Sequence, residues 1–154
     1  MTNLLRVSEA ASLAMHATVL LAASRDRALT TSQIAAVLGV SGAHLSKVLQ
    51  RLGRAGLVHS TRGPKGGFSL TRPSEQITLL EVYEAIEGIV VPASCLFDTA
   101  ICRGDRCILG GLIAEVNDHV RQYLGRTRLS DVSDVVADLV AAAVAETDAK
   151  QVGH

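Results

Sequence analysis

Four apolar residues at helical spacing, flanked by glycine-containing turns, most constrain how this 154-residue chain can fold. They fall at positions i, i+3, i+4 and i+7, which predicts a helix with one buried stripe: Leu45, Val48, Leu49 and Leu52. Gly39 can adopt the left-handed turn conformation just before this helix, and Ser41 can cap its first turn. A shorter apolar pattern over residues 34–38 predicts another helix, and Thr30 and Gln33 have the spacing of a capping box at its start. Two helices joined by a tight glycine turn predict a helix-turn-helix.

A glycine-rich segment follows this pair of helices. Residues 57–60 and 68–71 are short and strand-like, and the seven residues between them include three glycines, one proline and two cations. Such a composition is typical of a hairpin tip. A basic hairpin directly after a helix-turn-helix predicts a winged helix. With an amphipathic pattern over 108–124 and a further helix over about 130–145, the fold class is mainly α with one small hairpin wing.

Charge is strongly segregated although the formal net charge is zero. No acidic residue occurs between Asp26 and Glu75, and that window carries seven Lys or Arg, so the rest of the chain has a charge of −7. A basic block is typical of a protein that binds a polyanion. Charge runs also occur on faces that contact only solvent, and a winged helix can serve protein contacts alone. Because the cations fall on the expected helix and wing together, we favour double-stranded DNA.

Phosphate and base contacts need short polar or basic side chains and helix N-termini. The second helix and the wing supply the main candidates, and the start of the first helix supplies further hydroxyl and amide groups. The predicted DNA-binding residues are Thr31, Ser32, Gln33, Ser41, His44, Ser46, Lys47, Arg51, Arg62 and Lys65.

Three cysteines lie within thirteen residues, and the chain has no others: Cys95, Cys102 and Cys107. An odd, clustered set is poorly suited to disulfides, whereas soft thiolates bind iron–sulfur clusters and metals. Zinc sites usually use closer Cys pairs, and an iron–sulfur cluster tolerates irregular spacing and a non-Cys ligand. Arg103 and Arg106 would stabilise an anionic cluster or a thiolate. Zinc, a metal-free thiol switch and three core cysteines remain alternatives.

Residues 4–140 resemble the small Rrf-type bacterial repressors, a family that includes the iron–sulfur regulators IscR, NsrR and RirA. The resemblance is carried by LSKVLQRL at 45–52, AGLV at 55–58, RGPKGGF at 62–68 and ITLLEV at 77–82. It implies a homodimer in which the long helix crosses its partner, and two reading heads on a near-palindromic operator. It also implies that the three cysteines hold an iron–sulfur cluster, either 2Fe-2S or 4Fe-4S.

The division of the chain that follows is 1–75 as winged helix-turn-helix DNA-binding domain and 76–91 as connecting helix. The cysteine loop is 92–107, the dimerisation helix 108–125, the C-terminal helix 129–146 and the flexible tail 147–154.

The fourth ligand of the cluster departs from one family pattern. Members with a downstream His ligand place it three residues after the last Cys, where this chain has Gly110. Other members use a carboxylate from the first helix of the second subunit, and Glu9 occupies the comparable place. Glu9 from the partner subunit is therefore the expected fourth ligand, with His16 in reserve. An ordinary surface role for Glu9 and a core role for His16 are the alternatives.

We therefore expect a cytoplasmic, dimeric transcription regulator, acting as a repressor, whose operator binding is controlled by an iron–sulfur cluster that senses redox state, nitric oxide or iron. No apolar run is long enough to span a bilayer, so no membrane association is expected. We find no nucleophile–base pair and no phosphate-binding loop, and expect no enzymatic activity. A thiol-switch or zinc-bound regulator is one rival, and a small iron–sulfur redox protein is a more remote one.

Overall fold

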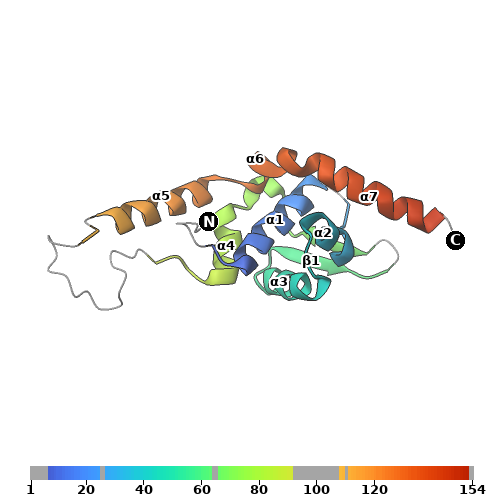
Figure 1. Cartoon of the computed structure of the whole chain (residues 1–154), viewed down its shortest axis with the longest axis horizontal. Coiled ribbons are helices and arrows are strands. Elements are labelled where there is room, and N and C mark those ends of the chain that lie inside the picture. Colours follow the sequence, from blue (N-terminus) through green and yellow to red (C-terminus); the bar gives the residue numbers. More distant parts are fainter. Residues whose placement is uncertain (1–6, 25–26, 64–65, 92–107, 110, 153–154) are drawn as a thin grey trace.

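The computed structural model describes residues 7–24, 27–63, 66–91, 108–109 and 111–152. In chain order, its longer elements are α1 (Glu9–Ala23), α2 (Thr31–Leu38), α3 (Gly42–Arg54), β1 (Val58–Thr61), β2 (Gly67–Leu70), α4 (Leu79–Glu87), α5 (Leu112–Arg126), α6 (Leu129–Val132) and α7 (Ala137–Val152). Two 3-10 turns join them, η1 (Ser74–Gln76) and η3 (Ser133–Val136). The chain is mainly helical with one antiparallel hairpin, as the sequence predicted (Figure 1). No helix in the described ranges is both long and apolar enough to cross a membrane.

The core lies where α1, α2, α3 and α4 meet. Its main contributors from α3 are Leu45, Val48, Leu49 and Leu52, each at most 2% exposed, which confirms the predicted stripe. Burial of one such side chain contributes about 1.5–3 kcal/mol relative to its exposed state. Helix α1 lies across this core, and its inner face consists largely of alanine and leucine. The small alanine side chains let the neighbouring helices approach closely.

The wing pairs Val58 with Leu70 and Thr61 with Gly67. Each strand lies one residue nearer the turn than predicted, and the pairing of opposite residues is the one that the predicted ranges imply. Leu29 and Phe68 exchange two backbone hydrogen bonds of 3.0 and 2.8 Å. This bridge ties the base of the wing to the residue that precedes α2.

Gly67 is required for that bridge. Its φ is +153°, and a Cβ built there would lie 2.6 Å from the Leu29 carbonyl oxygen. Side chains larger than hydrogen would therefore displace either the strand or the residues before α2. The glycines of the hairpin thus determine the position of the wing as well as its turn.

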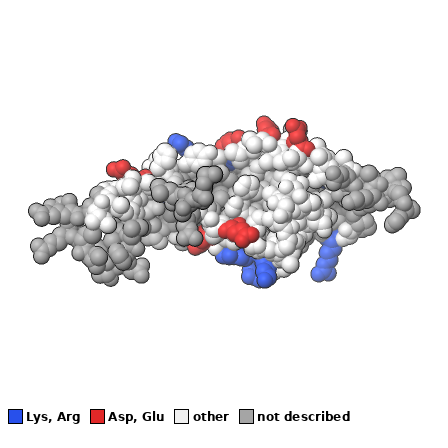
Figure 2. All heavy atoms as spheres, in the orientation of Figure 1, with Lys and Arg blue, Asp and Glu red and all other residues white. Residues whose placement is uncertain are grey.

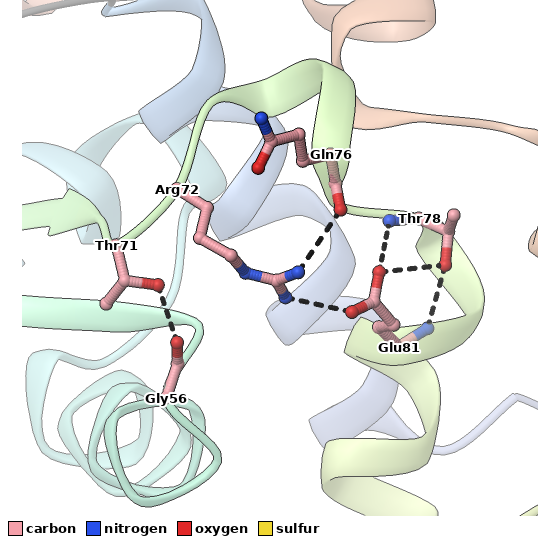
Figure 3. A network of polar contacts seen from close by, with 6 residues as sticks. All are labelled: Gly56, Thr71, Arg72, Gln76, Thr78 and Glu81. Carbon is pink, nitrogen blue, oxygen red and sulfur yellow. Dashed lines mark hydrogen bonds and ion pairs between the residues drawn. The ribbon is translucent and has the colours of Figure 1, made fainter.

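A polar network joins the end of the wing to α4 (Figure 3). Arg72 donates to the Glu81 carboxylate at 2.8 Å and to the Gln76 carbonyl at 3.3 Å. Glu81 also accepts from the Thr78 backbone N–H at 2.9 Å, which completes a capping box at the start of α4. Burial raises the pKa of Glu81. Hydrogen bonds from Arg72 and Thr78 and the charge of Arg72 together lower it by more, so the pKa lies below its usual value.

The C-terminal segment packs against the DNA-binding domain. Leu129 is fully buried and Val140 is 6% exposed, and both belong to the same core as α1 and α3. Backbone hydrogen bonds of 3.0 Å from Leu129 to Ile77 and of 2.9 Å from Leu79 to Thr127 fasten the start of α6 to the start of α4. The packed unit therefore extends well beyond residue 75, where the sequence predicted the domain to end.

The predicted single helix over 129–146 is interrupted. A 3-10 turn over 133–136 separates α6 from α7, and α7 continues to Val152, into the predicted tail. Periodicity could not reveal the interruption, because Leu129, Val132, Val136 and Val140 would form one stripe on a continuous helix. The dimerisation helix is also shorter at its start than predicted, since α5 begins at Leu112.

Candidate nucleic-acid interface

The helix-turn-helix is built from local hydrogen bonds. The Thr30 hydroxyl accepts from the Gln33 backbone N–H at 3.2 Å, and the Gln33 side chain accepts from the Thr30 N–H at 2.8 Å. Gly39 ends α2 with φ +66°. The Ser41 hydroxyl then accepts from the His44 backbone N–H at 3.2 Å and caps α3. The turn, the cap and the capping box therefore form as the sequence predicted.

The face of α3 opposite its buried stripe is exposed and polar. It consists of residues spaced four, three and four apart, which share one side of a helix: Ala43, Lys47, Gln50 and Arg54. All of them are exposed, and Lys47 is the one that the sequence had selected. We call this surface the outer stripe of α3. Gln50 and Arg54 were missing from the predicted site, although the spacing from Lys47 was sufficient to find them.

His44 and Arg51 lie on a different side of α3, the flank that faces α1 and α4. The Nδ1 of His44 is 3.5 Å from Oε1 of Glu9 at the start of α1. The Arg51 guanidinium donates a hydrogen bond to the backbone carbonyl of Ile86, near the end of α4. Both residues were predicted to contact DNA. The structure gives each a contact with a neighbouring helix, while Arg51 is exposed and the His44 side chain is 40% exposed.

The remaining predicted positions divide between exposed and enclosed sites. Ser32, at the start of α2, is exposed, and Thr31 beside it is half-buried. Gln33 is only 9% exposed, and its side-chain oxygen is occupied by the capping box. A phosphate only accepts hydrogen bonds, so the predicted contact would have to come from the Gln33 amide NH2, and this side chain is largely buried. Ser41 is exposed at the start of α3, and Ser46 is half-buried.

The wing contributes Arg62, which is exposed immediately after β1. The second wing cation, Lys65, lies outside the described residues. Figure 2 shows Lys and Arg side chains projecting from the lower edge of the molecule, beneath α3 and at the wing. Asp and Glu side chains line the opposite edge, over α6 and the start of α7. Cations from α3 and the wing thus share one edge of the molecule, although an acidic group also lies just above them and another cation lies on the upper edge.

The predicted cluster ligands Cys95, Cys102 and Cys107 lie outside the described residues, as does Gly110. Glu9 is described, and its side chain is 73% exposed. His16 is also exposed, and its Nδ1 is 2.7 Å from the Ser12 carbonyl oxygen. Within the described ranges, no group of three or more His, Cys, Asp or Glu side chains could hold a metal ion. A cluster would therefore need the cysteine segment.

Comparison with known proteins agrees with this architecture. The profile of the Rrf2 family, described as iron-dependent transcriptional regulators, matches residues 7–135. The chain belongs to the Rrf2 family. This Rrf2 protein is 36% identical over 126 residues to the HTH-type transcriptional regulator YwgB of Bacillus subtilis, a match that covers 79% of this chain and 81% of YwgB. It is 29% identical over 109 residues to IscR of Xenorhabdus nematophila, covering 71% and 66% of the two chains.

Solved structures of Rrf2 proteins share the fold. CymR of B. subtilis, described as its global cysteine regulator, superposes with a TM-score of 0.73 at 26% identity, over 86% of this chain and 98% of CymR. IscR of T. potens superposes with a TM-score of 0.68 at 24% identity, over 86% and 88% of the two chains. The predicted winged-helix fold and family are therefore confirmed. This Rrf2 protein is a DNA-binding transcription regulator and not an enzyme.

Proposed function

We propose that this protein is a homodimeric, cytoplasmic repressor whose binding to a near-palindromic operator is controlled by an iron–sulfur cluster. The observation that carries the proposal is the position of the three cysteines. They follow α4, which packs against the recognition helix α3, and they precede α5, whose apolar side chains are partly exposed. A group bound there can move the reading head relative to the dimer helix.

The outer stripe of α3 and the wing supply the DNA contacts. Lys47 and Arg54 would contact phosphates along the edges of the major groove with Gln50 between them, and Arg62 would reach further phosphates beside it. About three cations per subunit give about six phosphate contacts per dimer. Operator affinity should then fall about 10³-fold between 50 and 200 mM salt, since each neutralised phosphate releases condensed counterions.

That salt dependence can be measured by fluorescence anisotropy on a duplex from the chain's own promoter. Lys47→Met should reduce the slope of log affinity against log salt. Arg126→Met is the matched control, because it removes the same charge from α5, where the guanidinium lies 5.9 Å from the Tyr123 ring centroid. This interface would be excluded if operator affinity did not depend on salt, or if Lys47→Met and Arg126→Met reduced the salt slope equally.

The apolar face of α5 supports the homodimer. Leu112, Val116 and Tyr123 are 52%, 41% and 47% exposed, and no residue of α5 is fully buried. A cavity of about 450 Å³ lies between α4 and α5, lined in part by Leu80 and Val120. A second copy of α5 would cover this surface. Val116→Lys should yield monomers in light scattering, whereas Gln122→Lys, on the exposed part of the same helix, should leave the dimer intact.

Three thiolates and one carboxylate are a donor set that suits an iron–sulfur cluster. Cys95, Cys102 and Cys107 would hold it, with Glu9 of the second subunit as the fourth ligand. The cluster supplies a redox- and nitric oxide-sensitive centre whose gain or loss shifts the population of DNA-binding conformations. In the chain as described, Glu9 lies against His44, so ligation would require the carboxylate to leave that position.

Anaerobic purification tests the cluster. The protein should be brown, and the visible absorption should be lost in Cys102→Ser but kept in Thr99→Ser, a control in the same segment. Gel shifts of the brown and metal-depleted forms on the promoter duplex should then differ. A colourless protein from an anaerobic preparation would refute the cluster.

A thiol-based regulator without a cluster is the second candidate. The structural likeness to CymR, a global cysteine regulator, favours it. This alternative predicts a colourless protein whose operator affinity changes when Cys102 is oxidised and recovers on reduction. Cys102→Ser would abolish that response.

A further inference from the structure

We propose that Arg51 is a positioning residue that fastens the recognition helix α3 to the end of α4. Through it, the conformation of the chain just after Gly88 would set how α3 is presented to DNA. The inference rests on the proposed function, since it concerns how a signal in the cysteine segment would reach the operator. It starts from contacts among three elements that are distant in sequence.

The first contact is that of Arg51 itself. Its guanidinium donates to the Ile86 carbonyl across 35 positions of sequence, and this carbonyl belongs to the last turn of α4. Carbonyls in a last turn have no partner within their own helix, so a cation there satisfies an otherwise unpaired group. Arg51 therefore joins the exposed end of one helix to the side of another.

Two further contacts surround this one. Ser8, the N-cap of α1, donates to the Glu87 carboxylate at the end of α4. Glu9 lies 3.5 Å from His44, which is two turns before Arg51 on the same flank of α3. The start of α1, the flank of α3 and the end of α4 therefore meet at one junction. Movement of the last turn of α4 would therefore act on α3 directly at Arg51 and, through the start of α1, at His44.

The end of α4 depends on a single backbone conformation. Gly88 has φ +88° and ψ 175°, a region that is accessible essentially to glycine alone. Its N–H donates to the Glu84 carbonyl at 2.9 Å, and the Val90 N–H donates to the Glu84 carboxylate at 3.0 Å. Cys95 follows only seven residues after Gly88. Tension or release in the cysteine segment would therefore act directly on this helix end.

The position of Arg51 distinguishes it from a phosphate contact. Arg54, one turn later, belongs to the exposed outer stripe of α3, whereas Arg51 bonds to α4. Loss of Arg54 should weaken binding to every DNA sequence alike. Loss of Arg51 should instead alter the angle of α3, and this would affect the operator more than other DNA.

The test compares Arg51→Met with Arg54→Met in the full-length, metal-depleted protein. Amide hydrogen exchange in free protein gives a readout that needs no DNA. Arg51→Met should speed exchange at Gly88 and Val90 by about tenfold, the factor expected for one lost hydrogen bond to a charged group. Arg54→Met should leave those amides as in wild type.

Binding to the promoter duplex and to a shuffled duplex of equal composition gives the second readout. Arg51→Met should reduce the ratio of the two affinities about tenfold with little change in salt dependence. Arg54→Met should keep the ratio and make the salt slope less steep. In Gly88→Ala the added Cβ would meet no atom within 4 Å, so its effect would come from the backbone conformation, whose φ is +88°. This variant should reduce the affinity ratio as Arg51→Met does, and the double variant should reduce it no more than either single change.

Unchanged exchange in Arg51→Met, or equal weakening on both duplexes with a reduced salt slope, would overturn the inference and make Arg51 a phosphate contact. The inference would also be overturned if Arg51→Met and Gly88→Ala reduced the affinity ratio independently, so that the double variant lost the product of the two single losses. If the wild-type protein binds neither duplex, the proposed function fails, and the exchange comparison still decides whether Arg51 holds α4.

Discussion

Truncation of Leu129 should destabilise the DNA-binding domain, although this residue lies 75 positions after the end of α3. Its side chain is 0% exposed within the core that α1 and α3 share. Leu→Ala at such a site removes the transfer free energy of the side chain and leaves a cavity, which together cost about 3–5 kcal/mol. Total stabilities of about 5–15 kcal/mol make this a large fraction.

The measurement is urea unfolding followed by circular dichroism at one fixed protein concentration, because a dimer's stability depends on that concentration. In a parallel thermal melt at the same protein concentration, the melting temperature should fall by about 6–20 °C, from roughly 2–4 °C per kcal/mol for a chain of this size. Leu139→Ala is the matched control, since Leu139 lies on α7 and is 53% exposed. It should cost less than about 1 kcal/mol.

If Leu129→Ala cost no more than Leu139→Ala, α6 would not be part of the folded core and the domain would end near residue 75. A low-temperature unfolding step confined to the C-terminal helices would lead to the same conclusion.

Three further outcomes are expected. Gly67→Ala should break the Leu29–Phe68 bridge, since its Cβ would lie 2.6 Å from the Leu29 oxygen, and should cost more than about 1 kcal/mol in urea unfolding. Gly42→Ala, where a Cβ meets no atom within 4 Å in the first turn of α3, should instead be neutral or stabilise by up to about 1 kcal/mol. The pKa of Glu81 is lowered on folding, so its contribution to stability is present above the unfolded-state pKa of 4.5 and is lost as pH falls through the folded-state pKa. Arg72→Gln should therefore make the melting temperature depend less on pH between pH 6 and 3.

Local chemistry made much of the reading head predictable. The buried stripe of α3, the Thr30–Gln33 capping box and the Ser41 cap all depend on residues within one or two turns of each other, so spacing alone identifies them. The hairpin was predictable for the same reason, because its turn is marked by glycine. The strand ends differ by one residue from the predicted ranges, while the pairing of opposite residues is the one that those ranges imply.

The candidate interface was only partly predictable. Helical spacing separates the buried side of α3 from the exposed one, but it cannot say which neighbour covers the flanks. By spacing, Arg51 and His44 are candidates for DNA contact as Lys47 is, and only the positions of α4 and α1 show that they also contact neighbouring helices. Gln33 was also predicted to contact DNA, and the structure shows that its side chain closes the capping box and is 9% exposed.

The sequence by itself determined the winged helix, the basic block and the clustered thiols, because periodicity, caps, turns and composition are local properties, and the resemblance of its motifs pointed to the family. The tertiary structure decided that α6 and α7 complete the same core, and that Arg51 bonds to the end of α4. Both depend on contacts between residues tens of positions apart. Such contacts are set by the packing of whole helices, and no short stretch of sequence records them.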